Sequence, residues 1–269
     1  MSTIHAEFHS NALTRPADFW MFLPEKLPEE LFGQNPHYSR PPKALILLHG
    51  YTGSCSDWLY HSLAAELSMK YNLAIVMPTG GISFYLDRPG VGNAYCRFVG
   101  EDLPNYLSST FGLAKNKQDT FIAGNSMGGF GALHTALAYP ERFGCGIGLS
   151  SALIIHQVAG MKPDDSIHKR NIMADYAYYL ETFGEPSKVL DSKNNPETLV
   201  KNLKAEGKAI PRLFMACGTE DFLLNQNREF HQFLVDQKVP VKYVEDTGAH
   251  DWPFWNKMIE PAIRWALEI

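Results

Sequence analysis

Apolar residues in this chain gather in short continuous runs, and the segments between these runs have helical spacing. One run, 44–48, reads as a strand buried on both faces, as in a parallel sheet, and a helix with Leu59, Leu63 and Leu67 on one face follows it. The predicted parallel strands are 44–48, 73–77, 119–123, 145–149, 212–216 and 241–244. Strands alternating with helices predict right-handed βαβ units, and therefore an α/β fold with a mostly parallel central sheet flanked by helices.

Two segments depart from this alternation. Residues 3–9 and 18–23 alternate apolar and polar positions, which predicts an antiparallel hairpin at one edge of the sheet. Residues 151–210 are mostly polar, with helical patches at 172–183 and 196–204, so we expect a cap-like insertion over one face rather than another sheet layer. Its aromatic residues are expected to pack rather than bind ligands: Tyr176, Tyr178, Tyr179 and Phe183. We therefore expect a single domain over residues 1–269 that carries this insertion.

Composition narrows the classes of partner. With 24 basic and 29 acidic residues the net charge is −5, and the basic residues are scattered, which argues against nucleic acid. The aliphatic run at 44–48 is too short to span a membrane, and the first residues lack the pattern of a secretory signal, so we expect a cytoplasmic protein without a membrane partner. The four isolated cysteines suit reduced thiols. A homo-oligomer is compatible with the sequence.

The strongest chemical motif lies where the strand 119–123 meets the next helix. Gly124-Asn125-Ser126-Met127-Gly128 places one serine between two glycines, as in a nucleophile elbow. The glycines allow strand and helix to pack closely, so that the serine hydroxyl stands clear at the tip of a strained turn. We therefore expect Ser126 to be a nucleophile.

A serine nucleophile needs a base and an acid that orients the base. In folds with a nucleophile elbow, the acid and then the histidine follow the serine along the sequence. Asp221 follows the strand 212–216, and His250 follows the strand 241–244, so both lie where carboxyl-end loops meet. Glu220 stays open as an alternative acid. His156 and His168, in the insertion, are the weaker alternative bases; other acidic residues nearby are expected to serve the turn (Asp246) or to cap the last helix (Asp251).

Acyl transfer also needs donors for an oxyanion, and two backbone N–H groups can supply them. Met127, directly after the serine, would give the first, and Tyr51 in the His49-Gly50-Tyr51 loop would give the second. His49 is expected to hold this loop by hydrogen bonds. The chain contains neither a phosphate-binding Gly-x-x-x-x-Gly-Lys motif nor a His-Glu-x-x-His zinc motif, so we expect no cofactor and no metal.

Several of these stretches together resemble the α/β-hydrolase esterases of the esterase D group, above all the bacterial tributyrin-esterase-like enzymes and, more distantly, the S-formylglutathione hydrolases. The matching stretches are His49-Gly50, Val76-Met77-Pro78, 121–129, Cys217-Gly218 with Asp221-Phe222-Leu223, and His250-Asp251-Trp252. The resemblance implies an α/β-hydrolase fold and hydrolysis of short-chain acyl esters by Ser126, Asp221 and His250, with Tyr51 and Met127 as oxyanion donors. Asn125 departs from the histidine that precedes the nucleophile in S-formylglutathione hydrolases.

The sequence thus predicts a serine carboxylesterase that hydrolyses acetyl to butyryl esters of small molecules through an acyl-enzyme. The polar insertion offers no long aliphatic stripe for a longer chain, as its charged residues show: Lys162, Asp164, Asp165, Lys169 and Arg170. Candidate walls of the substrate pocket are Trp58, Tyr95 and Trp252, although each also suits packing. The alternatives are an S-formylglutathione hydrolase and, from another class, a catalytically silent α/β-hydrolase fold used for binding.

Overall fold

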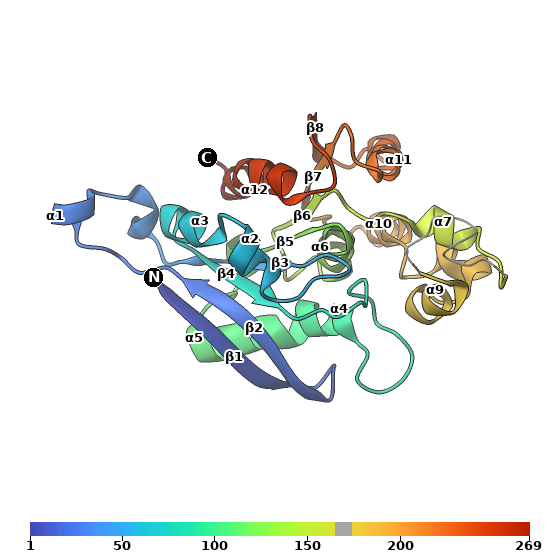
Figure 1. The fold of residues 1–269 in the computed structure, drawn as a ribbon, viewed down its shortest axis with the longest axis horizontal. Coiled ribbons are helices and arrows are strands. Elements are labelled where there is room, and N and C mark those ends of the chain that lie inside the picture. The colour runs from blue at the N-terminus through green and yellow to red at the C-terminus, as the bar shows by residue number, and fades with distance from the viewer. Residues whose placement is uncertain (165–173) are drawn as a thin grey trace.

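The computed structural model describes residues 1–164 and 174–269. In these ranges, eight strands form one sheet in the order β1-β2-β4-β3-β5-β6-β7-β8 (Figure 1). The strands are β1 (Ser2–Ser10), β2 (Arg15–Leu23), β3 (Lys43–Leu48), β4 (Leu73–Pro78), β5 (Thr120–Asn125), β6 (Cys145–Leu149), β7 (Arg212–Gly218) and β8 (Val241–Asp246). β1, β2 and β4 pair antiparallel, whereas β4, β3 and β5 to β8 pair parallel. The predicted α/β fold and its N-terminal hairpin are confirmed.

Helices cover both faces of this sheet (Figure 1). One face packs against α3 (Ala64–Tyr71) and α12 (Trp252–Leu267), and the other against α5 (Leu103–Phe111), α6 (Met127–Ala138) and α11 (Leu224–Asp236). Side chains alternate along each strand, so Leu45 and Leu47 of β3 join the core under α3 and α12, while Ile46 and Leu48 join the core under α6. Both faces are buried, which explains why the parallel strands read as unbroken apolar runs.

The segment after β6 forms helices and adds no strand among the residues that the structure describes. Its elements are α7 (Ile155–Ala159), α9 (Tyr176–Phe183), a 3₁₀ turn (Pro186–Asp191) and α10 (Pro196–Ala205). They gather at one end of the molecule beside α6 (Figure 1). Tyr179 and Phe183 are buried, and Phe183 packs edge-on against Phe84 and Phe130, so these aromatic residues belong to the core as predicted. Residues 172 and 173, at the start of the predicted helical patch, lie outside the described ranges.

The helix predicted around 59–67 is interrupted, which corrects the sequence-based expectation. It consists of α2 (Asp57–His61) and α3, with Ser62 extended between them. The Ser62 hydroxyl donates to the carbonyl of Trp58 and accepts from the N–H of Ala64 at 3.1 Å, so one side chain caps both helices. Leucine spacing alone could not reveal this break. The remaining short elements are α1 (Glu29–Phe32), α4 (Tyr95–Arg97), a π turn (Phe98–Asp102) and 3₁₀ turns at Pro36–Ser39 and Lys117–Asp119.

Candidate active site

Ser126 sits in a strained turn between β5 and α6. Its backbone has φ 54° and ψ −119°, a left-handed conformation that costs a non-glycine residue about 1–3 kcal/mol. Two hydrogen bonds fix this turn: the Ser126 N–H donates to Leu149 at 2.9 Å, and the Ala152 N–H donates to the Ser126 carbonyl at 2.9 Å. A Cβ on Gly124 would lie 2.4 Å from the carbonyl of Gly128, so this crossing leaves no room for a side chain. The turn therefore presents the serine hydroxyl at the carboxyl edge of the sheet.

The hydroxyl of Ser126 meets His250 and, through it, Asp221. His250 Nε2 lies 2.9 Å from Ser126 Oγ, and His250 Nδ1 lies 2.9 Å and 3.1 Å from the two carboxylate oxygens of Asp221. With the proton on Nδ1, the ring donates to Asp221 and accepts from the serine hydroxyl. Such a chain can take the hydroxyl proton as the serine attacks a carbonyl carbon.

The carboxylate of Asp221 is fully buried and held in several directions. It accepts the N–H of Leu223 at 2.8 Å in addition to the bonds from His250. Burial by itself raises the pKa of Asp221, but the bonds from His250, the charge that this ring can carry, and the Leu223 and Ser150 donors outweigh it, so the pKa lies below its ordinary value. Asp221 is therefore ionised at neutral pH and can stabilise a positively charged imidazole.

Among the described residues, the other acids and bases weighed from the sequence lie outside this chain of hydrogen bonds. Asp246 pairs with Lys257 at 2.9 Å and accepts the N–H of Thr247. Asp251 caps α12 by accepting the N–H of Phe254 at 3.1 Å, as predicted. Glu220 is exposed, and its backbone N–H donates to the carbonyl of Gly248 in the neighbouring loop. His156, near the start of the insertion, pairs with Glu197 at 2.8 Å, and His168 lies outside the described residues.

The loop after β3 also comes close to the serine. A Cβ on Gly50 would lie 3.6 Å from the Cβ of Ser126, so the backbone at Gly50 and Tyr51 runs close to the nucleophile. His49 holds this loop as predicted: its Nε2 accepts the N–H of Gly80 at 2.9 Å, and its Nδ1 donates to the Gly50 carbonyl at 2.8 Å. Met127 is the first residue of α6, where helix geometry leaves the N–H without an intrahelical partner.

The insertion touches this loop through Tyr178. The rings of Tyr51 and Tyr178 meet edge to face with centroids 5.7 Å apart, and the Tyr178 hydroxyl donates to the carbonyl of Ile82 at 2.8 Å. α9 is thus bonded to the 79–93 loop and packs on the loop that carries the candidate oxyanion donor.

The three candidate pocket walls lie in different surroundings. Trp58 is only 1% exposed, and its indole N–H donates to the carbonyl of Leu48 at 3.0 Å, so its contacts are those of a core residue. Tyr95 is buried beneath the 79–93 loop, where its hydroxyl accepts from Arg15 at 2.7 Å. Trp252 is partly exposed at the start of α12 and packs against Trp58 and Trp255. Of the three, Trp252 alone is not buried.

Nothing in the described residues points to metal or thiol chemistry. They contain no group of three or more His, Cys, Asp or Glu side chains arranged to hold a metal ion. Burial raises the pKa of Cys96, Cys145 and Cys217 to about 12, which makes these thiols poor nucleophiles. In the part of the chain that the structure describes, no helix is long and apolar enough to cross a membrane.

Comparison with known proteins decides the family. The chain matches the model of the family described as "Putative esterase" over residues 10–266. It is 40% identical over 269 residues to an acetyl esterase of Caldicellulosiruptor saccharolyticus, covering 100% of this chain and 99% of the relative. The chain belongs to this esterase family.

Solved structures agree with this assignment. The esterase is similar to FphF of Staphylococcus aureus, a fluorophosphonate-binding serine hydrolase, with a TM-score of 0.81, and to the S-formylglutathione hydrolase FrmB of the same organism, with a TM-score of 0.80. Each is 26% identical to this chain, and each likeness covers 98% of both chains. The protein is therefore a carboxylic ester hydrolase with the α/β-hydrolase fold, as its resemblance to the esterase D group implied.

Sequence reasoning missed two residues that surround Asp221 and His250, the candidate acid and base. Ser150, directly after β6, is buried, and its Oγ accepts the indole N–H of Trp255 at 3.1 Å and reaches the carboxylate of Asp221. The ring of Trp255 stands edge-on to His250, with centroids 5.2 Å apart. A polar residue at the end of a parallel strand was the available signal for Ser150. Trp255 gave none, because tryptophan inside a final amphipathic helix reads as core.

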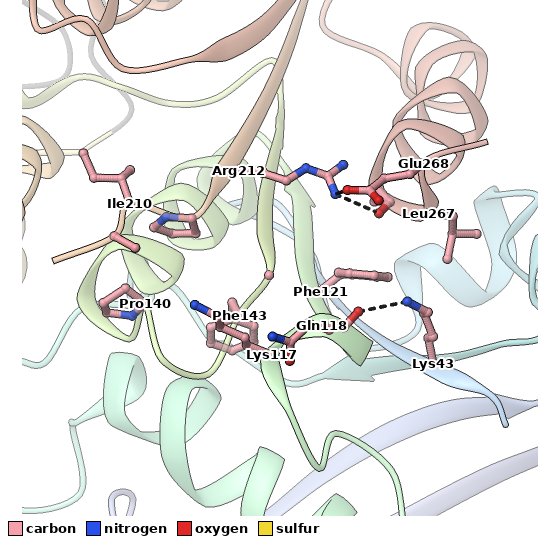
Figure 2. A pocket seen from close by; sticks show the side chains of 14 residues that line it. Lys43, Lys117, Gln118, Phe121, Pro140, Phe143, Ile210, Arg212, Leu267 and Glu268 are labelled. Carbon is pink, nitrogen blue, oxygen red and sulfur yellow. Dashed lines mark hydrogen bonds and ion pairs between the residues drawn. The ribbon is translucent and has the colours of Figure 1, made fainter. Parts of the chain in front are cut away.

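A cavity of about 330 Å³ lies at the other end of the strands (Figure 2). Lys43 and Arg212, the first residues of β3 and β7, line it, and Figure 2 shows their side chains bonded to Gln118 and Glu268. Arg212 also donates to carbonyl groups in the last turn of α12. These charged groups join the end of the last helix to the sheet, and none of the proposed catalytic residues lines this cavity.

Proposed function

We propose that the esterase uses Ser126 as nucleophile, His250 as general base and acid, and Asp221 as the orienting carboxylate. One observation carries this proposal: Ser126 Oγ, His250 Nε2 and the buried carboxylate of Asp221 form one continuous chain of hydrogen bonds. His250 takes the proton of the serine hydroxyl as Ser126 Oγ bonds to the ester carbon. Asp221 holds the ring in the tautomer that this transfer requires and stabilises the imidazolium that results.

The tetrahedral intermediate places a negative charge on the former carbonyl oxygen, and we assign the backbone N–H groups of Tyr51 and Met127 to bind it. The close approach of Gly50 to Ser126 and the free N–H at the start of α6 support this assignment. Loss of one such donor typically costs about 10²–10³ in kcat. His250 then gives its proton to the leaving alcohol, and a water molecule, activated by the same histidine, hydrolyses the acyl-enzyme.

The proposed substrates are acetyl to butyryl esters of small alcohols. The acetyl esterase relative supports a short acyl group, and so do the charges of the insertion, of which Lys162 and Asp164 lie in the described ranges. Asp165, Lys169 and Arg170 lie outside them. Trp252 is kept as a candidate wall beside the histidine loop. The isolated free cysteines support action in a reducing compartment, the cytoplasm.

S-formylglutathione hydrolysis is the second candidate, because FrmB is similar over nearly the whole chain and the enzyme of Paracoccus denitrificans is 27% identical over 155 residues. Asn125 argues against it, since the resemblance to the S-formylglutathione hydrolases implies histidine before the nucleophile. A direct comparison of kcat/KM for S-formylglutathione and for acetyl esters separates the two.

Nitrophenyl esters of increasing chain length test the acyl preference. Each methylene buried in a deep apolar tunnel would contribute about 0.8 kcal/mol. We expect kcat/KM to peak between acetyl and butyryl and to fall by octanoyl, measured below the micelle threshold of each ester. A maximum at decanoyl would refute the short-chain preference. Labelling with a fluorophosphonate tests the nucleophile, because a silent binding fold would give no adduct on Ser126.

A further inference from the structure

An exposed aromatic ring stands beside the histidine of the proposed triad. Phe222 is 64% exposed, and its ring lies against the imidazole of His250 with centroids 4.5 Å apart and planes tilted by 46°. Single exposed apolar residues are common on protein surfaces and need no explanation by themselves. Phe222 differs because it follows the acid in sequence and contacts the base in space.

The loop that carries Phe222 is rigidly bonded, so the exposure of the ring is built into the fold. The N–H of Thr219 donates to Asp246 and that of Glu220 to Gly248, each at 2.9 Å. On the far side of Phe222, the N–H of Leu223 donates to the carboxylate of Asp221 at 2.8 Å. Asp221 and Leu223 are both buried, so the residue between them is turned outward. The bonds that hold the Asp221 carboxylate therefore also hold the backbone on either side of Phe222.

The chemistry of the proposed reaction says which part of the substrate reaches this ring. His250 Nε2 must protonate the alcohol oxygen as it leaves the tetrahedral intermediate, so the alcohol departs next to the imidazole. The acyl group stays on Ser126 at that moment. A group that extends from the alcohol oxygen past the imidazole therefore meets Phe222.

We propose that Phe222 forms an alcohol-side subsite that binds a flat apolar face of the leaving alcohol. Two kinds of alcohol offer such a face, an aromatic ring and the C–H face of a sugar ring, and both can stack on phenylalanine. This inference rests on the proposed function, because it takes His250 to be the group that protonates the alcohol.

Acetyl esters that differ only in the alcohol test the subsite. We compare benzyl acetate, a 6-O-acetylated methyl glucoside and ethyl acetate, using the wild type, Phe222→Ala and Phe222→Tyr. In Phe222→Ala, the ratio of kcat/KM for a flat alcohol to that for ethyl acetate should fall about 5- to 20-fold, mostly through KM. Phe222→Tyr keeps a flat ring and should retain the ratio of the wild type. A fall for the benzyl ester alone identifies an aromatic occupant, and a fall for the sugar ester alone identifies a sugar.

Two outcomes would overturn the subsite. Equal losses of kcat for all three esters in Phe222→Ala would mean that the ring merely supports His250, and unchanged ratios would mean that it binds no alcohol. Hydrolysis of the acetyl-enzyme is a further readout: no alcohol is present in that step, so its rate should be the same in Phe222→Ala and wild type. Failure of a small fluorophosphonate to label Ser126 in the wild type would instead refute the proposed triad, independently of Phe222.

Discussion

The two ends of the parallel strands both carry charged residues, which are buried at the carboxyl end and exposed at the amino end. At the carboxyl end, the side chains of Asp221 and His250 are 0% and 17% exposed and belong to one chain of hydrogen bonds that ends at Ser126. At the amino end, Arg212 and Glu268 are 38% and 72% exposed and form an ion pair that lines a cavity. The amino end thus has an exposed ion pair beside a cavity, whereas the carboxyl end has the buried groups that we propose for catalysis.

The difference follows from how parallel strands end. Each strand that leaves the carboxyl edge leads into a loop, so residues after β3, β5, β7 and β8 converge there. Burial then strengthens every bond in the network, because water no longer competes for it. At the amino end the charged side chains of Arg212 and Glu268 face solvent, where an ion pair contributes about 0–1 kcal/mol to stability. A hollow with charges is therefore a weak sign of a site, and a buried, fully bonded set of charges is a strong one.

The largest effect should come from breaking the chain of hydrogen bonds at the carboxyl end of the strands. Ser126→Ala and His250→Ala should each lower kcat by about 10⁴–10⁶, and the double variant should lose little more, because the residues act as a unit. Arg212→Gln at the amino end is the matched control. It removes an ion pair and helix-end bonds, so it should lower the melting temperature while kcat stays within about twofold. Strictly additive losses in the double variant would contradict the assignment.

Asp221 and Glu220 are adjacent carboxylates, and one variant of each tests which of them is the acid. Asp221→Asn should lower kcat by about 10⁴, because an amide in that place favours the wrong imidazole tautomer. Glu220→Gln changes an exposed side chain and should alter kcat by no more than about twofold. Steady-state rates on one acetyl ester decide between them. The reverse order of effects would make Glu220 the acid.

The sequence predicted the strands, the hairpin and the residues of the hydrogen-bonded chain because their signals are local. An apolar run, a glycine on each side of Ser126, and polar residues directly after strands can all be read from neighbouring positions. Ser150 and Trp255 act on Asp221 and His250 from other elements, and only the packing of α12 on β6 brings them there. The break at Ser62 escaped for a different reason: its bonds to Trp58 and Ala64 are local, but the leucine spacing around it is that of a continuous helix.

Acid should destabilise the fold through a buried histidine of α6. His134 of α6 is buried, its Nε2 lies 2.9 Å from the carbonyl of Lys193 in the insertion, and burial lowers its pKa from 6.5 to about 4. Because the unfolded chain binds this proton more readily, folding should lose up to about 3 kcal/mol as the pH falls from about 6.5 to 4.

Urea unfolding between pH 7 and pH 4 measures this loss. His134→Gln should flatten the pH dependence in that window, although it is less stable at pH 7. The exposed His9→Gln variant should keep the slope of the wild type. An unchanged slope in His134→Gln would show that other groups cause the acid sensitivity.

The smallest expected effect on kcat tests whether the hydrogen-bonded network around Asp221 extends to Ser150. The neighbouring Ser151 provides the comparison. Ser150 and Ser151 are both buried, but the Ser150 hydroxyl bonds Trp255 and reaches Asp221, whereas the Ser151 hydroxyl has no partner in the described part of the chain. Ser150→Ala should lower kcat about tenfold, or about 1.4 kcal/mol, since Asp221 loses one donor and keeps its others. KM should stay nearly constant, because Ser150 does not touch the substrate. Ser151→Ala removes an unbonded polar group and should leave kcat unchanged while stability stays level or rises. Equal losses in the two variants would mean that the network at the carboxyl end stops at Asp221, and that Ser150 serves only the packing of α12 on the sheet.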